Sequence, residues 1–211
     1  MNCSIDSEEE GERRGRMISE LVRKWTAGVV NPIARAVART GISPNALTIF
    51  GSLLYLGIAY VLAKGWFFWG GIFIIFASLF DALDGAVARV SNRVSRFGAF
   101  LDSNLDRFSE ALMYFGLLFY YIHHGTTTNT ILVYAAIIGS LMVSYARARA
   151  EGIGVECKEG LLSRFERLAI LVIALVLNVV PLALWVLAIL TNLTAFQRMY
   201  YVWRKTEQKQ E

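Results

Sequence analysis

Six long apolar stretches alternate with short polar breaks along the chain, at about 45–63, 67–90, 97–122, 129–150, 161–179 and 181–203. Each is close to the roughly 20 mostly apolar residues that a helix needs to cross the hydrocarbon core of a bilayer. Pro181 suits the first turn of the last stretch, because an N–H group is not needed there. The pattern predicts an all-α membrane protein with six transmembrane helices.

The flanking segments complete the predicted domain organisation. Residues 1–16 are polar, and no apolar segment follows them directly, which favours a disordered cytosolic tail over a signal peptide. Residues 17–41 form a juxtamembrane region, residues 42–204 the transmembrane domain, and residues 205–211 a short cytosolic tail.

The juxtamembrane region has the pattern of an amphipathic helix. Asn31 can serve as an N-cap, and Pro32 then occupies the first helical position. Four-residue spacing places Ile33 with Val37 on one face and Arg35 with Arg39 on another. We therefore expect a cytoplasmic helix lying on the membrane surface, with its arginines near anionic headgroups. An ordinary solvated helix is the alternative.

Charge and composition set the orientation and the class of protein. Hydrophobic residues make up 55% of the chain and charged residues 18%, which is typical of membrane proteins. Arginines and lysines gather in the second and fourth loops and at the C-terminus, so both termini are expected in the cytoplasm. The two cysteines, Cys3 and Cys157, are far apart in the sequence and form no CxxC motif, which argues against a disulfide framework or a zinc site.

Four aspartates interrupt this apolar pattern. Asp81 and Asp84 fall in the second stretch, and Asp102 and Asp106 fall in the third. Carboxylates within a transmembrane helix are costly and usually mark function. The spacing places each pair on one helix face, and a short turn over residues 91–96 makes the two helices antiparallel neighbours. The four carboxylates are therefore expected to converge near the cytoplasmic interface.

Such a cluster of anions requires a counter-charge. Carboxylate oxygens suit Mg²⁺, Mn²⁺ or Ca²⁺, and shared carboxylates can bridge two ions. Pairing with nearby arginines would explain one or two surface aspartates, but it does not explain Asp81, which follows an apolar run.

The segment from Asp81 to Asp106 reads D-x2-D-G-x2-A-R-x8-G-x3-D-x3-D. It resembles the signature of the CDP-alcohol phosphotransferase family at every fixed position, and the resemblance extends from about residue 31 to residue 204. It implies six transmembrane helices, a homodimer, a polar cavity open to the cytoplasm, and two Mg²⁺ or Mn²⁺ ions. The implied metal ligands are Asp81, Asp84, Asp102 and Asp106.

The same resemblance implies the reaction. Asp106 would deprotonate an acceptor hydroxyl, which attacks the β-phosphate of a CDP-lipid and displaces CMP. The residues alone leave open whether Asp106 is the base, a metal ligand or both. The implied CDP-lipid site comprises Asn45, Ala46, Leu47, Thr48, Gly85, Arg89 and Ser95. Asn45 or Thr48 fits a plain N-cap role equally well.

A phosphorylated acceptor requires a basic pocket, preferably of arginines. The arginine-bearing segments of the last three stretches are similar to those of phosphatidylinositol phosphate synthases and their archaeal relatives. That resemblance implies that Arg147, Arg164 and Arg198 bind the acceptor phosphate. Arg149 and Arg167 fit a role as headgroup anchors equally well.

The expected substrates are CDP-diacylglycerol or CDP-archaeol and inositol 1-phosphate. Glycerol 3-phosphate is the alternative acceptor, which would make the chain a phosphatidylglycerophosphate synthase. An ion transporter is a more distant alternative; it would need acidic residues in the outer half and an internal repeat, and the sequence has neither. The sequence therefore predicts a multi-pass enzyme of the cell membrane with a cytoplasmic active site and no nucleic-acid partner.

Overall fold

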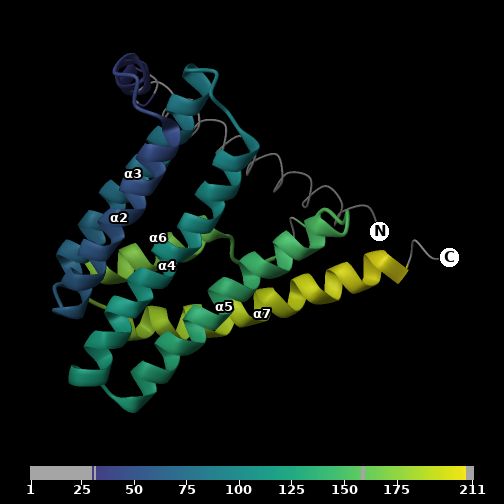
Figure 1. Ribbon diagram of the computed structural model, residues 1–211. Helices are drawn as coiled ribbons and strands as arrows, with labels where there is room; N and C mark the ends of the chain where they lie inside the picture. Colours follow the sequence, from purple (N-terminus) through teal and green to yellow (C-terminus); the bar gives the residue numbers. More distant parts are fainter. Residues whose placement is uncertain (1–29, 31, 158–159, 208–211) are drawn as a thin grey trace, which may run out of the picture. The chain divides into compact units, whose positions relative to one another are not determined.

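The computed structural model describes residues 30, 32–157 and 160–207 (Figure 1). After a short helix over residues 32–39, the elements are α2 (Pro44–Ala63), α3 (Phe67–Val90), α4 (Arg96–His124), α5 (Thr127–Gly152), α6 (Arg164–Val176) and α7 (Val180–Glu207). Each of these six coincides with one predicted apolar stretch, so the all-α prediction is confirmed. Several predictions fall on residues that the structure does not describe. These residues are the tail over 1–16, the juxtamembrane residues 17–29 and Asn31, and the end of the C-terminal tail over 208–211.

Local hydrogen bonds explain where several helices begin and end. The Thr126 hydroxyl accepts a hydrogen bond of 3.2 Å from the Asn129 N–H and caps α5. The Ser163 N–H donates to the Glu166 carboxylate at the start of α6. After α6, Asn178 has a φ of +57°, which ends the helix. Helix α6 is therefore shorter than the predicted stretch 161–179.

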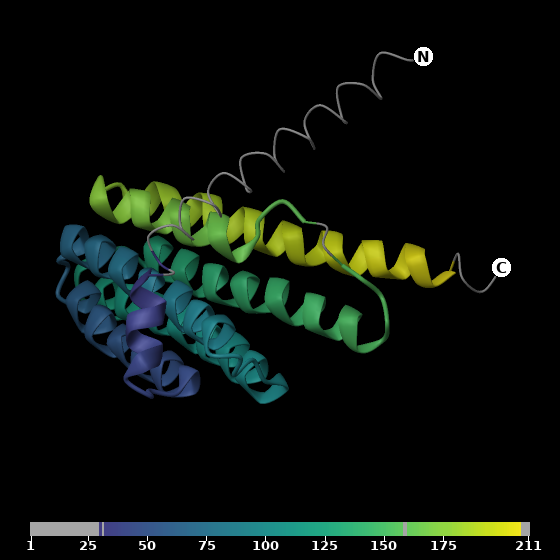
Figure 2. The same cartoon turned by 90° about the horizontal axis from the view of Figure 1, so that it is seen from above.

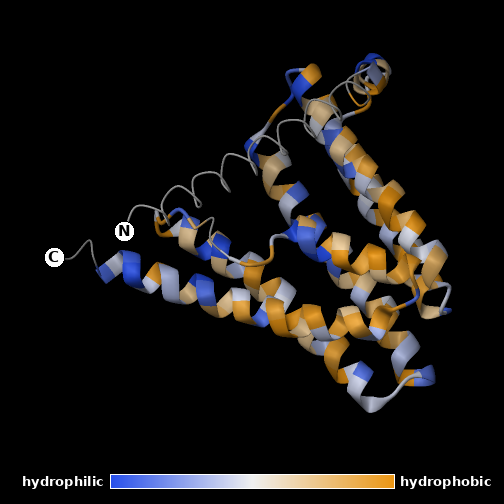
Figure 3. Ribbon diagram, turned by 180° about the vertical axis from the view of Figure 1, so that it is seen from behind, coloured by the Kyte–Doolittle hydropathy of each residue, from blue (hydrophilic) through white to orange (hydrophobic). Residues whose placement is uncertain are grey.

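Four helices, α2, α3, α5 and α7, are long and apolar enough to cross a membrane, which confirms a multi-pass membrane protein. Helices α4 and α6 do not meet this criterion, for different physical reasons. Helix α4 has 29 residues but carries the charges of Asp102, Asp106 and Glu110, and α6 has only 13 residues. Figure 3 shows apolar residues concentrated in the first half of α7 and polar residues toward its end.

The described chain divides into two compact units. The first contains residues up to Ile49 together with Leu79–Asp102. Its small core consists of Ala34, Ala86 and Val87, with Leu47 packed against them. The short helix over residues 32–39 is therefore attached to the last turns of α3 through small side chains.

The second unit contains Phe50–Ser78 and the chain from Ser103 onward. Within it, α5 and α7 lie side by side (Figures 1 and 2). Gly139 of α5 faces Thr191 of α7 so closely that a Cβ atom at Gly139 would overlap the Thr191 side chain. The Asn192 amide also donates a hydrogen bond of 3.0 Å to the Ala135 carbonyl. Small residues and interhelical hydrogen bonds of this kind are typical of membrane helix packing.

Candidate functional site

The first unit contains a cavity of about 300 Å³ that is lined in part by Asp84 of α3 and Asp102 of α4. Its walls come from the start of α2, the end of α3 and the start of α4. The lining residues are Pro44, Asn45, Thr48, Asp84, Gly85, Ala88, Arg89, Arg93, Val94, Ser95, Gly98, Ala99 and Asp102. Polar donors, a carboxylate pair and two arginines therefore face one space of small-ligand size.

Asp84 is the buried acidic group of this cavity, with 5% of its surface exposed. The Thr48 hydroxyl, which donates a hydrogen bond of 3.1 Å to the Pro44 carbonyl, lies close to this carboxyl group, and the Asp81 and Asp102 carboxylates lie within electrostatic reach. Three like charges in one region repel one another unless a cation compensates them. Their hard oxygen donors fit a divalent ion such as Mg²⁺ or Mn²⁺.

The described residues do not form a complete metal-binding site. No group of three or more His, Cys, Asp or Glu side chains there has a geometry ready to hold a metal ion. Asp81, Asp84 and Asp102 belong to the first unit, whereas Asp106 belongs to the second. The structure therefore supports the chemistry of the predicted ligands but leaves the metal site itself a prediction.

The predicted CDP-lipid residues separate into two groups. Asn45, Thr48, Gly85, Arg89 and Ser95 line the cavity. Ala46 and Leu47 do not, because the intervening positions of α2 point elsewhere, and Leu47 packs against the core around Val87.

Two glycines of the signature, Gly85 and Gly98, line this cavity. A Cβ atom at Gly98 would lie 3.0 Å from the Ser95 hydroxyl and 3.1 Å from the Asn45 side-chain oxygen. The Gly98 N–H also donates a hydrogen bond of 2.9 Å to the Ser95 hydroxyl, which caps α4. A Cβ atom at Gly85 would lie 3.4 Å from the Arg89 guanidinium. A side chain at Gly98 would therefore crowd polar groups that line the cavity, whereas one at Gly85 would make an ordinary van der Waals contact.

In the second unit, Asp106 faces an arginine of α6. The Arg164 guanidinium lies 2.7 Å from the Asp106 carboxylate, and both side chains are partly exposed. The structure thus joins the predicted base to one of the three arginines predicted to bind the acceptor phosphate. This contact had no signal in the sequence.

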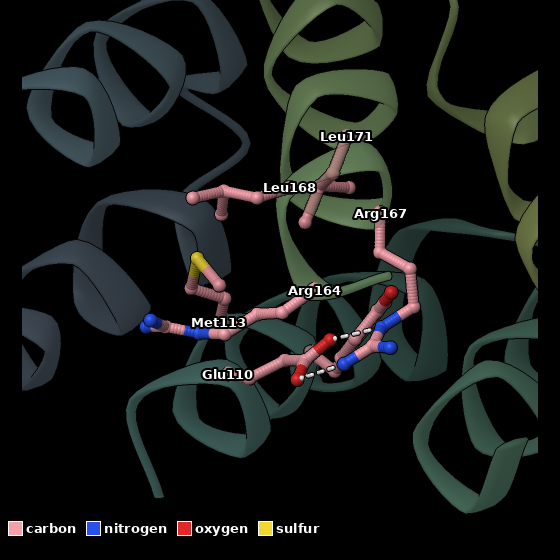
Figure 4. A pocket seen from close by; sticks show the side chains of 7 residues that line it. Glu110, Met113, Arg164, Arg167, Leu168 and Leu171 are labelled. Atoms are coloured by element: carbon pink, nitrogen blue, oxygen red, sulfur yellow. Dashed lines mark hydrogen bonds and ion pairs between the residues drawn. The ribbon is translucent and has the colours of Figure 1, made fainter. Parts of the chain in front are cut away.

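A second ion pair between the same helices was also missed by sequence reasoning. Arg167 donates two hydrogen bonds of 2.8 Å to the Glu110 carboxylate, and both residues are buried (Figure 4). Arg167 is therefore not a headgroup anchor. Two spacings could have indicated the pair: Glu110 follows Asp106 by four residues, and Arg167 follows Arg164 by three.

The other two predicted acceptor arginines lie on α5 and α7. Arg147 is exposed and pairs with Glu151 at 2.9 Å. Arg198 is buried; it donates a hydrogen bond of 2.7 Å to the Val143 carbonyl and lies within electrostatic reach of Arg147 and Arg167. The second unit therefore brings Arg147 and Arg167, each paired with a glutamate, within electrostatic reach of Arg198.

Comparisons with known proteins agree with the signature. The sequence model described as CDP-alcohol phosphatidyltransferase matches residues 41–197. A phosphatidylinositol phosphate synthase of Mycobacteroides abscessus is 35% identical over 191 residues, covering 86% of this chain and 87% of that protein. An archaetidylinositol phosphate synthase of Pyrococcus horikoshii is 38% identical over 176 residues, covering 83% of this chain and 91% of that protein.

Solved structures are similar over most of the chain. Phosphatidylinositol phosphate synthase of Mycobacterium tuberculosis with bound CDP-diacylglycerol has a TM-score of 0.80 at 32% identity, covering 84% of this chain and 94% of that one. The same enzyme with manganese and citrate has a TM-score of 0.79 at 32% identity, covering 82% and 88%. With the signature, the cavity and these relatives in agreement, the chain belongs to the CDP-alcohol phosphatidyltransferase family of membrane enzymes.

Proposed function

We propose that this enzyme transfers a phosphatidyl or archaetidyl group from a CDP-activated lipid to inositol 1-phosphate and releases CMP. The observation that carries this proposal is the cavity in which Asp84, Gly85 and Arg89 of the signature meet Asn45 and Thr48. Relatives named phosphatidylinositol and archaetidylinositol phosphate synthases support the choice of acceptor.

The first-unit cavity would receive the CDP part of the donor. Asn45, Thr48 and Ser95 offer hydrogen-bonding groups, and Arg89 and Arg93 offer charge that suits a diphosphate. The M. tuberculosis enzyme that holds CDP-diacylglycerol supports this assignment. The two signature glycines would leave room for the nucleotide to approach the backbone.

Asp81, Asp84, Asp102 and Asp106 would hold the divalent metal, with two Mg²⁺ or Mn²⁺ ions as the proposed complement. When bound, these ions would neutralise the diphosphate and stabilise the departing CMP. The manganese in the M. tuberculosis structure supports a divalent ion. Asp102 and Asp106 share one face of α4 at four-residue spacing, which suits a shared role.

Asp106 would also accept the proton of the acceptor hydroxyl. The hydroxyl oxygen then bonds to the β-phosphorus, the bond from that phosphorus to the bridging oxygen breaks, and CMP leaves with the electron pair. Arg164 pairs with Asp106 in the structure. We propose that the acceptor phosphate takes over Arg164, so that Asp106 becomes available to the hydroxyl. A purely metal-binding role for Asp106 is the alternative.

Arg147 and Arg198 would complete the acceptor-phosphate site. Both carry charge in the second unit, and Arg198 is held by the Val143 carbonyl in a fixed orientation. Guanidinium groups bind phosphate oxygens in a bidentate manner, which favours arginine for this purpose.

We further propose six membrane crossings, with both termini and the active site in the cytoplasm, and a homodimer. The hydropathy pattern of the sequence and the distribution of basic loop residues support the topology. Reporter fusions at each loop would test it, and chemical cross-linking in native membranes would test the dimer.

The reaction is tested with purified protein, Mg²⁺, and CDP-diacylglycerol or CDP-archaeol. Inositol 1-phosphate, free inositol and glycerol 3-phosphate are supplied separately, and CMP and lipid products are measured. The expected result is CMP release with inositol 1-phosphate and formation of the phosphorylated inositol lipid. Preference for glycerol 3-phosphate would instead identify a phosphatidylglycerophosphate synthase, and CMP release with no acceptor at all would refute the assigned acceptor site.

A further inference from the structure

A groove lies between the last turns of α5 and α7 in the second unit. Its volume is about 360 Å³. Figures 1 and 2 show the two helices side by side and ending on the same side of this unit. Tyr145 and Arg149 of α5 and Met199 and Trp203 of α7 are among the side chains that line it. The groove is separate from the cavity that holds the signature residues of the first unit.

The lining of this groove is mostly apolar. Besides two arginines, it consists of methionine, alanine, isoleucine, valine and two aromatic side chains, with no carboxylate among its described residues. Ile153 is 56% exposed, Met199 43% and Trp203 53%. A contiguous apolar surface of this kind marks a place where another apolar group binds. Hydrocarbon therefore fits the groove better than a small polar molecule does.

The groove reaches from the depth of the acyl chains to the level of the headgroups. Arg149 lies 22 residues after Thr127, the start of α5, which is about 33 Å along the helix axis. This distance slightly exceeds the roughly 30 Å of the hydrocarbon core, whereas Met142 lies about 22 Å along the same axis. Tyr145 and Trp203 belong to the two residue types that gather at membrane interfaces. One end of the groove is therefore apolar, and the other end carries a charge at the membrane surface.

That charge has no protein counter-ion. Arg147, Arg164 and Arg167 each pair with a carboxylate. Arg149 is exposed and makes no ion pair with any residue in the part of the chain that the structure describes. A guanidinium group at the membrane surface binds phosphate oxygens well and attracts anionic lipids.

The groove differs from the proposed acceptor-phosphate site. Two residues correspond to about 200° around a helix, so Arg149 and Arg147 lie on nearly opposite faces of α5. Arg147 does not line the groove. Arg198 does, but it is buried, and its Nη1 atom donates a hydrogen bond of 2.7 Å to the Val143 carbonyl. The two sites therefore have only Arg198 in common.

We propose that this groove binds one anionic phospholipid of the surrounding bilayer, which is neither the donor nor the acceptor of the reaction. Its phosphate pairs with Arg149, and an acyl chain lies against Met142 and Met199. The complementarity of both charge and hydropathy favours such a lipid over any purely polar or purely apolar occupant. This binding site does not depend on the proposed function.

The test measures which lipids approach Trp203. The other four tryptophans are replaced by phenylalanine in the full-length chain, which is reconstituted into phosphatidylcholine vesicles. Either brominated phosphatidylglycerol or brominated phosphatidylcholine is then added, because bromine quenches tryptophan fluorescence on contact. Half-maximal quenching is expected at an about fivefold lower fraction of the anionic lipid, the size of effect that one basic residue has near an anionic surface. Equal quenching by the two lipids would overturn the proposal.

The charge is tested with two arginine variants. Arg149→Gln is expected to abolish the preference for the anionic lipid. Arg204→Gln is the matched control, because Arg204 is exposed near the end of α7 and does not line the groove. The control is expected to keep the preference within about twofold, since general attraction to a surface falls off within a Debye length. Equal losses in the two variants would show general attraction instead of a site, and would overturn the proposal.

The apolar part is tested by filling the groove. Ala146 lines it, whereas Ala148 is exposed and does not. Ala146→Phe is expected to reduce the preference for the anionic lipid, and Ala148→Phe to preserve it. Melting temperatures in detergent show whether both variants are folded. A preference that persists in folded Ala146→Phe would overturn the groove as the binding site; if that variant does not fold, the two arginine variants decide.

Two further results would identify another occupant and overturn the proposal. Displacement of the lipid by inositol 1-phosphate would assign the groove to the acceptor site. Protection of Trp203 from both lipids, in a dimer that Ala146→Phe dissociates, would show that a second copy of the chain covers the groove. Quenching is measured without substrates, so a lipid preference in a protein that is inactive with every acceptor would refute the proposed function alone.

Discussion

The Arg198 guanidinium packs directly against Gly160. A Cβ atom at Gly160 would lie 3.1 Å from Arg198 Nε and 2.7 Å from the Thr194 methyl group. Gly160 also has a φ of +138°, a conformation that is essentially restricted to glycine. This glycine therefore forms part of the wall that orients a buried arginine.

The first prediction concerns the contact between Gly160 and Arg198. Gly160→Ala is expected to displace Arg198, raise KM for a phosphorylated acceptor, and cost about 1–3 kcal/mol of stability from backbone strain. Gly154→Ala is the matched control, because Gly154 also has a positive φ, +76°, but nothing lies within 4 Å of its added Cβ atom. Kinetics and thermal melting of both variants separate strain from contact. Equal acceptor KM values in the two variants would contradict the contact with Arg198.

The second prediction concerns Arg164. Arg164→Ala is expected to weaken binding of a phosphorylated acceptor by about 1.5–3 kcal/mol, the range for hydrogen bonds to charged groups. The residue is partly exposed, so a large loss of stability is not expected. Acceptor KM and melting temperature are measured beside Arg204→Ala, which removes an exposed arginine near the end of α7. An unchanged acceptor KM in Arg164→Ala would exclude its proposed role.

The third prediction concerns the divalent metal. Chelation with EDTA is expected to abolish CMP release, and added Mg²⁺ or Mn²⁺ to restore it, because carboxylates are the proposed ligands. Asp84→Asn is expected to weaken Mn²⁺ binding in titration calorimetry, since it removes the charge of a buried carboxylate that is a proposed ligand. Glu207→Gln, at the exposed end of α7, serves as the control. Full activity in excess EDTA would rule out a metal-dependent reaction.

The fourth prediction concerns the Thr48 hydroxyl, which lines the cavity close to the Asp84 carboxyl group. Thr48→Val keeps the shape of the side chain and removes the hydroxyl, whereas Thr48→Ser keeps the hydroxyl. We expect Thr48→Val to weaken CDP-lipid binding by about 1–3 kcal/mol, because a hydroxyl group that lines the cavity is lost. Binding of the CDP-lipid by both variants is the measurement. If both variants lose the same affinity, the loss cannot be assigned to the Thr48 hydroxyl.

The fifth prediction concerns helix packing. Gly139→Ala is expected to separate α5 from α7, because its Cβ atom would overlap Thr191, and overpacking of this kind costs about 1–3 kcal/mol. Gly57→Ala, within α2, is the control, since nothing lies within 4 Å of its added Cβ atom. A lower melting temperature is expected for Gly139→Ala alone. Similar melting of the two variants would show that the α5–α7 approach can relax.

Much of the fold could be predicted because its signals are local. The hydropathy pattern predicted all six helices from α2 to α7, and the spacing from Asp81 to Asp106 predicted the family. The same local signals overestimated the length of α6. Ser163 caps its start, and the left-handed conformation of Asn178 ends it. Periodicity on α2 could likewise have separated Asn45 and Thr48 from Ala46 and Leu47, because only the first two face the cavity.

The sequence by itself determined the helices, the acidic signature and the class of reaction, because each depends on residue types at short, fixed spacing. Only the tertiary structure decided which arginine forms an ion pair with which carboxylate. Glu110 and Arg167 are 57 residues apart, and Arg198 meets both Val143 and Gly160 from a different helix. Hydropathy carries no information about such pairing, since a buried ion pair depends on the register of two packed helices rather than on either sequence alone.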